Sequence, residues 1–179
     1  KKNLKEGHTF VSSGPMLVFS IDGHLPGDEI NMSGPGKVSI KAKAFGNKGQ
    51  IPLSKLEIIG HGKVLRQVIP DGDEQTMENM VLNFDLDIKK GIWIAARCFA
   101  GPTQVAHTTP VYISVENNGF HNPETLQDYL TLNEKYLDDL EKELEEPNDR
   151  VDKRAWWYRD GLQERIGETR LVIESLREK

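Results

Sequence analysis

Short runs of alternating hydrophobic and polar residues, separated by Gly, Pro and Asp-Gly turn signals, fill the first two-thirds of the chain. Alternation with a period of two is typical of half-buried β-strands. The expected strands lie at residues 8–11, 16–21, 38–44, 56–59, 64–68, 81–88, 92–97 and 111–115. About eight short strands without a helical period predict a mostly β fold, an antiparallel, immunoglobulin-like β-sandwich over residues 1–121.

The stretch from Gly91 to Glu116 forms the centre of the predicted sandwich. Residues 92–96 (IWIAA) are the longest apolar run, and Arg97 closes it. A strand that is apolar on both faces is expected in the middle of a sheet, covered on both sides. A loop with Gly101 and Pro102 follows, and residues 111–115 resume as a strand.

The hydrophobic period changes near Asn122, where an Asn-Pro-Glu sequence favours the start of a helix. Leucines and tyrosines spaced by threes, fours and sevens predict an amphipathic helix up to a break at residues 147–149. A second amphipathic helix is expected from Arg150 onward. Together they predict an antiparallel helical hairpin over residues 122–179, packed on the sandwich through part of the Trp156-Trp157-Tyr158 group.

Charge is divided unevenly between these two regions. Residues 1–122 carry a formal charge of +1 and residues 123–179 one of -6, which together give the net -5. An acidic chain is not expected to bind nucleic acid. No apolar run approaches the roughly 20 residues that span a bilayer. The chain starts at Lys1 without a methionine, which suggests a piece of a longer protein, and localisation is left open.

Catalytic chemistry is sparse in the sequence. The five histidines are scattered, without a His-x-His pair or a helical His-x-x-x-His, so neither a metal site nor a cofactor site is predicted. Asp22 and His24 flank a turn glycine and lack a third ligand nearby. Cys98, the only cysteine, lies in the apolar strand and is expected to act as a small hydrophobe. No catalytic residue is nominated.

Arg97 and His107 are the only candidates for a functional role. A guanidinium at the end of a buried strand needs a partner to offset its desolvation. His107 precedes the next strand and is followed by two threonines, whose hydroxyls can orient an imidazole. Either Arg97 pairs with an acid or backbone carbonyls and His107 caps a turn, or both face a substrate or another domain.

Four segments of the sequence resemble one family in order and spacing. They are residues 5–17 (KEGHTFVSSGPML), 21–28 (IDGHLPGD), 93–97 (WIAAR) and 106–112 (AHTTPVY). These segments resemble the C-terminal region of CehA/McbA family metal-dependent hydrolases. The C-terminal hairpin, with Glu168-Thr169-Arg170, is also similar to that family's tail.

The resemblance implies a non-catalytic domain of a larger enzyme. In such proteins a catalytic domain of the polymerase and histidinol phosphatase (PHP) type comes first and binds divalent metals. Those ligand motifs have no counterpart in this chain. The expected role is therefore to brace that domain, as its partner, and to line its substrate cleft. The alternatives are a glycan-binding sandwich, which an exposed line of aromatics would favour, and a complete small enzyme.

Overall fold

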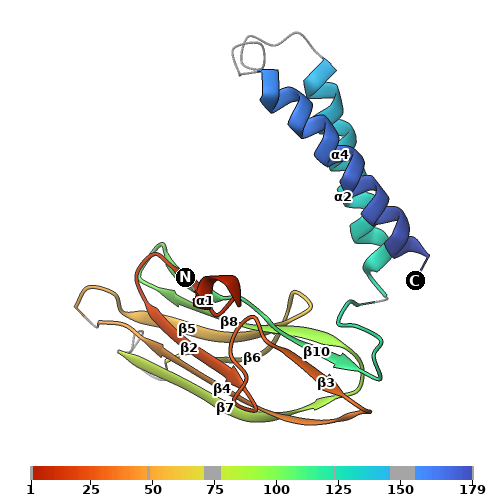
Figure 1. Cartoon of the computed structure of the whole chain (residues 1–179). Helices are drawn as coiled ribbons and strands as arrows, with labels where there is room; N and C mark the ends of the chain where they lie inside the picture. Colours follow the sequence, from red (N-terminus) through yellow and green to blue (C-terminus); the bar gives the residue numbers. More distant parts are fainter. Residues whose placement is uncertain (1, 48, 71–77, 123, 146–155, 179) are drawn as a thin grey trace. The chain divides into compact units, whose positions relative to one another are not determined.

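The computed structural model describes residues 2–47, 49–70, 78–122, 124–145 and 156–178 (Figure 1). For residues 156–160 it describes the backbone only. The chain divides into two compact units, Lys1–Asn122 and Pro123–Lys179. The first holds two β-sheets and the second a pair of helices. The predicted fold class, mostly β with a C-terminal helical hairpin, is confirmed. The predicted packing of the hairpin on the sandwich stays a prediction.

The smaller sheet consists of three antiparallel strands: β2 (Met16–Ile21), β4 (Gly36–Phe45) and β7 (Asn79–Ile88). Strand β4 shows why this sequence forms a sandwich strand. Its inward residues are apolar and buried, while the alternate positions carry lysines and a serine that face outward. A strand with one apolar and one polar face is stable where one face meets a core and the other meets water.

The larger sheet has seven strands, and β8 (Ile92–Ala100) lies at its centre. One edge of β8 pairs with β5 (Leu53–Gly60), which in turn pairs with β6 (Lys63–Val68). The other edge pairs with β9 (Gln104–Thr108) and β10 (Val111–Val115). Strand β1 (Phe10–Ser12) pairs with β9, and β3 (Glu29–Met32) pairs with β10.

Two of these strands differ from the sequence prediction. Strands β3 and β9 fall in segments that we expected to be loops, and β3 pairs in parallel with β10 in an otherwise antiparallel sheet. Both are short and depend on pairing with the more apolar strands β10 and β8. The first strand is also displaced, because β1 begins at Phe10. A helical turn, α1 (Lys2–Lys5), precedes it, and Gly7 follows with a φ of 73°, a conformation typical of the residue that ends a helix.

The core of the sandwich lies between the two sheets. Fully buried residues come from both layers, with Phe19 and Ile40 from the smaller sheet and Leu56, Ile94 and Ile113 from the larger. Burial of such a side chain contributes about 1.5–3 kcal/mol. The prediction that β8 is covered on both faces holds in part, because its outward residues Trp93, Arg97 and Phe99 are half-buried.

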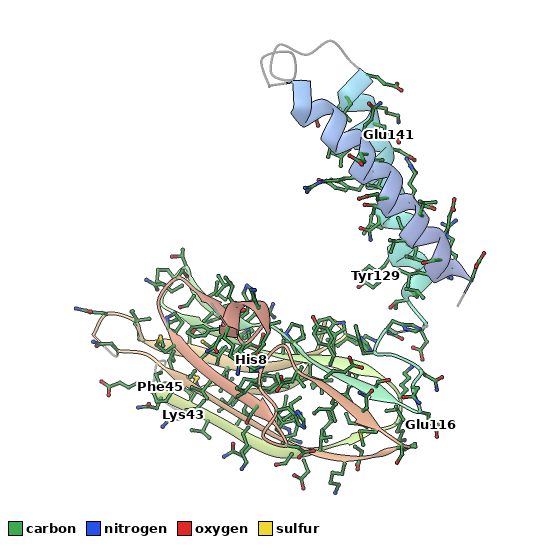
Figure 2. All side chains as sticks on the ribbon, viewed as in Figure 1. His8, Lys43, Phe45, Glu116, Tyr129 and Glu141 are labelled. Carbon is green, nitrogen blue, oxygen red and sulfur yellow. The ribbon has the colours of Figure 1, made fainter. Side chains whose placement is uncertain are left out.

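The second unit is an antiparallel pair of helices, α2 (Leu126–Glu145) and α4 (Trp156–Arg177). Its core is small and consists of Leu130, Leu137, Leu144, Ile166 and Ile173. The predicted stripe also included Tyr129 and Tyr136, but these are 58% and 61% exposed, so they lie off the buried face (Tyr129 is labelled in Figure 2). Residues 150–155 and the side chains of Trp156, Trp157 and Tyr158 lie outside the described residues.

Ion pairs join the two helices along the exposed side of this core. Arg170 donates to Asp138 and Glu141 at 2.7 Å each, and Arg177 pairs with Glu134. These carboxylates raise the pKa of Arg170 above its ordinary value. The acidic side chains of α2 are therefore partly neutralised by the arginines of α4. None of the described helices is long and apolar enough to cross a membrane.

Candidate functional site

Arg97 and His107 lie side by side on the outer face of the seven-stranded sheet. Arg97 on β8 is the register partner of Glu57 on β5 and of His107 on β9, and His107 is the partner of Val11 on β1. Side chains directly opposite each other on antiparallel strands project from the same face. Glu57, Arg97, His107 and Val11 thus form a row across the sheet. The structure brings the two nominated residues together, and their function stays a prediction.

Glu57 is the acid that holds Arg97. Its Oε2 accepts hydrogen bonds from Nε and Nη2 of Arg97 at 3.0 and 2.7 Å, and its Oε1 lies 2.7 Å from Nζ of Lys55. Glu57 is only 2% exposed. Burial raises the pKa of its carboxyl, but the bonds from Lys55 and Arg97 outweigh burial and hold the pKa below its ordinary value. The carboxylate is therefore ionised at neutral pH and fixes Arg97 in place.

The pair leaves part of the Arg97 guanidinium available. Its bonds to Glu57 involve Nε and Nη2, whereas a guanidinium has five N–H donors. Within the described residues, the Arg97 side chain forms hydrogen bonds to Glu57 alone. The guanidinium also lies over the Phe99 ring, 5.0 Å from its centroid, and the Lys55 ammonium lies over the same ring at 4.5 Å. Arg97 is thus both oriented and still able to donate hydrogen bonds.

A hollow of about 510 Å³ opens beside this row. Its walls come from β1, β5, β8, β9 and the segment after β9, namely Phe10, Val11, Ile59, Gly62, Trp93, Ala95, Ala96, Arg97, His107, Thr108, Thr109 and Pro110. Arg97 is the only charged residue among them. Most of the other side chains are apolar, and Ala95 is 8% exposed. The hollow therefore combines an apolar wall with one oriented cation.

His61 lies next to two residues that line the hollow, Gly62 and Trp93. With Gly62 it forms the two-residue turn between β5 and β6, where both residues have positive φ (47° and 77°), as in a type I′ hairpin. Its Nε2 lies 3.1 Å from the carbonyl oxygen of Gly91, and its ring meets Trp93 edge-to-face at 5.9 Å. Burial lowers the pKa of His61, so the ring is neutral at pH 7. These residues lie between two predicted strands, 56–59 and 64–68, and were not nominated as site residues.

The segment before β1 is held by backbone hydrogen bonds near the end of β9. Gly27 donates its N–H to Pro110 (2.8 Å), Thr109 donates its N–H to Thr9 (3.0 Å), and the two threonine hydroxyls lie 2.8 Å apart. Gly27 has a φ of 96°, and a Cβ there would collide with the carbonyl group of Glu6. Close backbone contact therefore fixes the chain just before it enters β1.

A histidine–aspartate bond completes this junction. His8, labelled in Figure 2, donates from Nε2 to Oδ1 of Asp28 at 2.8 Å, and Leu25 donates its backbone N–H to Oδ2 at 2.7 Å. Both bonds lower the pKa of the Asp28 carboxyl, and the bond from His8 has the larger effect. Segments 5–17, 21–28 and 106–112, which carry the family resemblance, meet here although they are far apart in the sequence. Sequence reasoning did not predict this convergence.

The remaining reactive side chains named in the sequence analysis, Cys98 and Asp22, have structural roles. Within the described ranges, no group of three or more His, Cys, Asp or Glu side chains is arranged to hold a metal ion. Burial raises the pKa of the Cys98 thiol to about 11, so this cysteine is protonated at neutral pH and unsuited to nucleophilic attack. Asp22 accepts the N–H of Ser39 and so acts in a turn.

Comparison with known proteins leaves the family open. No protein-family model and no curated protein matches the chain. Among solved structures, a superoxide reductase (neelaredoxin) from Ignicoccus hospitalis is similar, with 12% identity over 57% of this chain and 82% of that one and a TM-score of 0.34. A CARDB domain from Pyrococcus furiosus, solved with di-metal ions, is also similar. It has 18% identity over 57% of this chain and 96% of that one, with a TM-score of 0.34.

Proposed function

We propose that this sandwich is an accessory domain of a metal-dependent hydrolase of the PHP type, where it braces the catalytic domain and lines one side of the substrate cleft. The observation that carries the proposal is the convergence of three family-like segments on one edge of the seven-stranded sheet, beside Arg97 and His107. Divalent metal would then belong to the catalytic domain, and this chain would supply surface and charge.

The geometry of the junction supports a bracing role. A domain joined ahead of α1 would connect through residues 6–9, which are fixed to Asp28, Thr109 and the close-contact glycine Gly27. From there the chain passes directly into Phe10 and Val11, which line the hollow. The preceding domain would therefore enter next to the hollow through a rigid connection.

The glycan-binding alternative has less support. A sugar-binding face usually presents aromatic rings for stacking, and β8 does carry Trp93 and Phe99 on its outer face. However, Lys55 and Arg97 cover the Phe99 ring. Trp93 is then the one β8 ring that lines the hollow, which gives a short platform for a polymer.

The test is to prepare this chain and the catalytic domain of its parent protein as separate polypeptides. We expect the two to associate, and we expect the hydrolytic activity of the catalytic domain to rise when the chain is added. An Arg97→Ala variant should weaken both effects, whereas Lys43→Ala, on the outer face of the other sheet, should not. Absence of association together with unchanged activity would show that the accessory role is wrong. Binding to an immobilised glycan would support the alternative.

A further inference from the structure

The hollow on the outer face of the seven-stranded sheet has the composition of a small-molecule site. Its volume of about 510 Å³ falls in the range of ligand pockets, roughly 300–1,000 Å³. Such pockets are mostly apolar and carry a few oriented polar groups. Here the apolar part is Trp93, Ala95, Ile59 and Phe10, and the oriented polar group is Arg97.

The charge at one end of the hollow is positive. Glu57 is 2% exposed and does not line the hollow, so its charge is directed at Lys55 and Arg97. These three groups together carry one net positive charge. No lining residue is acidic, and His107 stands opposite Arg97 on the next strand as an exposed group that can also donate a hydrogen bond. An anion therefore meets donors without a competing carboxylate.

The apolar part of the hollow is shaped for a flat group. Ala95 is the smallest outward side chain of β8 and lies between Trp93 and Arg97, so it leaves space between an indole ring and a guanidinium. The edge-to-face contact with His61, at 5.9 Å and 88°, restricts rotation of the Trp93 ring. A planar body can thus pack beside Trp93 over Ala95 with its charged end at Arg97.

We propose that this hollow binds a small organic monoanion with a flat apolar body, of the aryl carboxylate class. The carboxylate accepts hydrogen bonds from the N–H groups of Arg97 that Glu57 does not hold, with His107 beside them. The aromatic body lies against Trp93 and above Ala95. The site belongs to the sandwich alone, so it does not depend on the accessory role proposed above.

The experiment is a titration of the full chain with 2-naphthoate, followed by amide chemical shifts in NMR spectra. The neutral isostere 2-naphthamide is titrated in parallel. We expect saturable binding of naphthoate with a dissociation constant of about 1 mM or tighter, with shifts centred on Trp93, Ala95 and Arg97. The neutral isostere should bind at least about tenfold more weakly, because it lacks the charge-assisted hydrogen bonds.

Three variants separate this site from binding elsewhere. Ala95→Leu fills the space above β8 without altering charge and should abolish binding, and Arg97→Met should weaken it at least about tenfold. Lys43→Met removes the cation that lies 4.5 Å from Phe45 on the other sheet and should leave binding unchanged. If Arg97→Met proves unstable, Ala95→Leu still decides the outcome. Equal binding by wild type and Ala95→Leu, equal binding of the two probes, or no saturable binding would overturn the proposal.

Discussion

The two outer faces of the sandwich are built from the same alternating pattern but differ in what they expose. On the three-stranded sheet, Lys37 lies opposite Asp87 and Lys41 opposite Asn83, while the exposed residues Val18 and Val81 flank Lys43 on either side. On the seven-stranded sheet, the outward residues of β8 are Trp93, Ala95, Arg97 and Phe99. The first face mixes charges of both signs with single exposed apolar side chains, which is typical of a solvated surface. The second concentrates one oriented cation against apolar walls.

Two similar side-chain pairs make this difference concrete. Lys43 lies over Phe45 at 4.5 Å, and Arg97 lies over Phe99 at 5.0 Å, each two residues apart on one strand (Lys43 and Phe45 are labelled in Figure 2). Only the second pair of these two is joined to a buried carboxylate, that of Glu57. A cation fixed by a buried acid keeps its orientation, whereas a surface lysine samples many rotamers. This distinction is why we propose a functional role for the second face.

The largest effect is expected from breaking the buried ion pair. Glu57→Gln leaves Arg97 and Lys55 without their carboxylate, and loss of one partner of a buried pair is costly. Because Arg97 is itself partly exposed, we expect the free energy of unfolding to fall by about 2–3 kcal/mol, measured by urea denaturation. Asp87→Asn, on the other face, should cost at most about 1 kcal/mol. Equal costs for the two variants would contradict the proposed difference between the faces.

The next effect concerns the glycine at the junction. Gly27→Ala places a Cβ against the carbonyl groups of residues 6 and 7, at 2.6 Å from the Gly7 carbon, on a backbone with φ of 96°. The matched control is Gly23→Ala, where φ is 84° and a Cβ meets nothing within 4 Å. The control should cost about 1–2 kcal/mol from backbone strain alone, and Gly27→Ala should cost more. Thermal unfolding measures both, and equal losses would show that the junction is not tightly packed.

A smaller effect is expected for the pH dependence of stability. Because the bond from His8 lowers the folded-state pKa of Asp28, this carboxyl stabilises the fold at neutral pH, and the stabilisation is lost as pH falls below about 4. Asp28→Asn should therefore show a smaller loss of stability between pH 6 and pH 3 than wild type. Urea midpoints at the two pH values test this. An identical loss in both proteins would mean that Asp28 contributes nothing to the pH dependence.

The smallest effect is expected for Cys98. Since burial raises its thiol pKa to about 11, the native protein should react with a maleimide at pH 7 far more slowly than the urea-unfolded protein. Mass spectrometry of the adduct follows both rates. Rapid labelling of the native chain would show that β8 opens readily, and the central strand would then be less rigid than its two-sided pairing indicates.

Much of the sandwich could be predicted because its longer strands are patterned by burial. The strand at residues 111–115 has the predicted bounds, and β8 has the predicted central position. Strands β3 and β9 could not be predicted, because both are short and depend on neighbours that only the fold supplies. Exposure of Tyr129 was missed for a related reason, since spacing alone does not say how wide a buried helical stripe is.

The candidate site was predicted in part. Arg97 attracted attention because a charge ending an apolar strand requires a partner, and the structure supplies Glu57. Glu57 itself could not be nominated, since the register between β5 and β8 places it opposite Arg97 and no local pattern encodes that register. The meeting of residues 6–9 with residues 25–28 and 109–110 is likewise a product of topology.

The central claim, that the Arg97 face serves the activity of a parent hydrolase, is tested most directly by Arg97→Lys in that full-length protein. Lysine keeps the charge toward Glu57 but lacks the planar fork. We predict that hydrolytic activity per folded molecule falls at least about tenfold, as loss of a charge-assisted hydrogen bond would give, while the melting temperature stays within a few degrees. A melting temperature that falls while activity per folded molecule holds would show that Arg97 is structural.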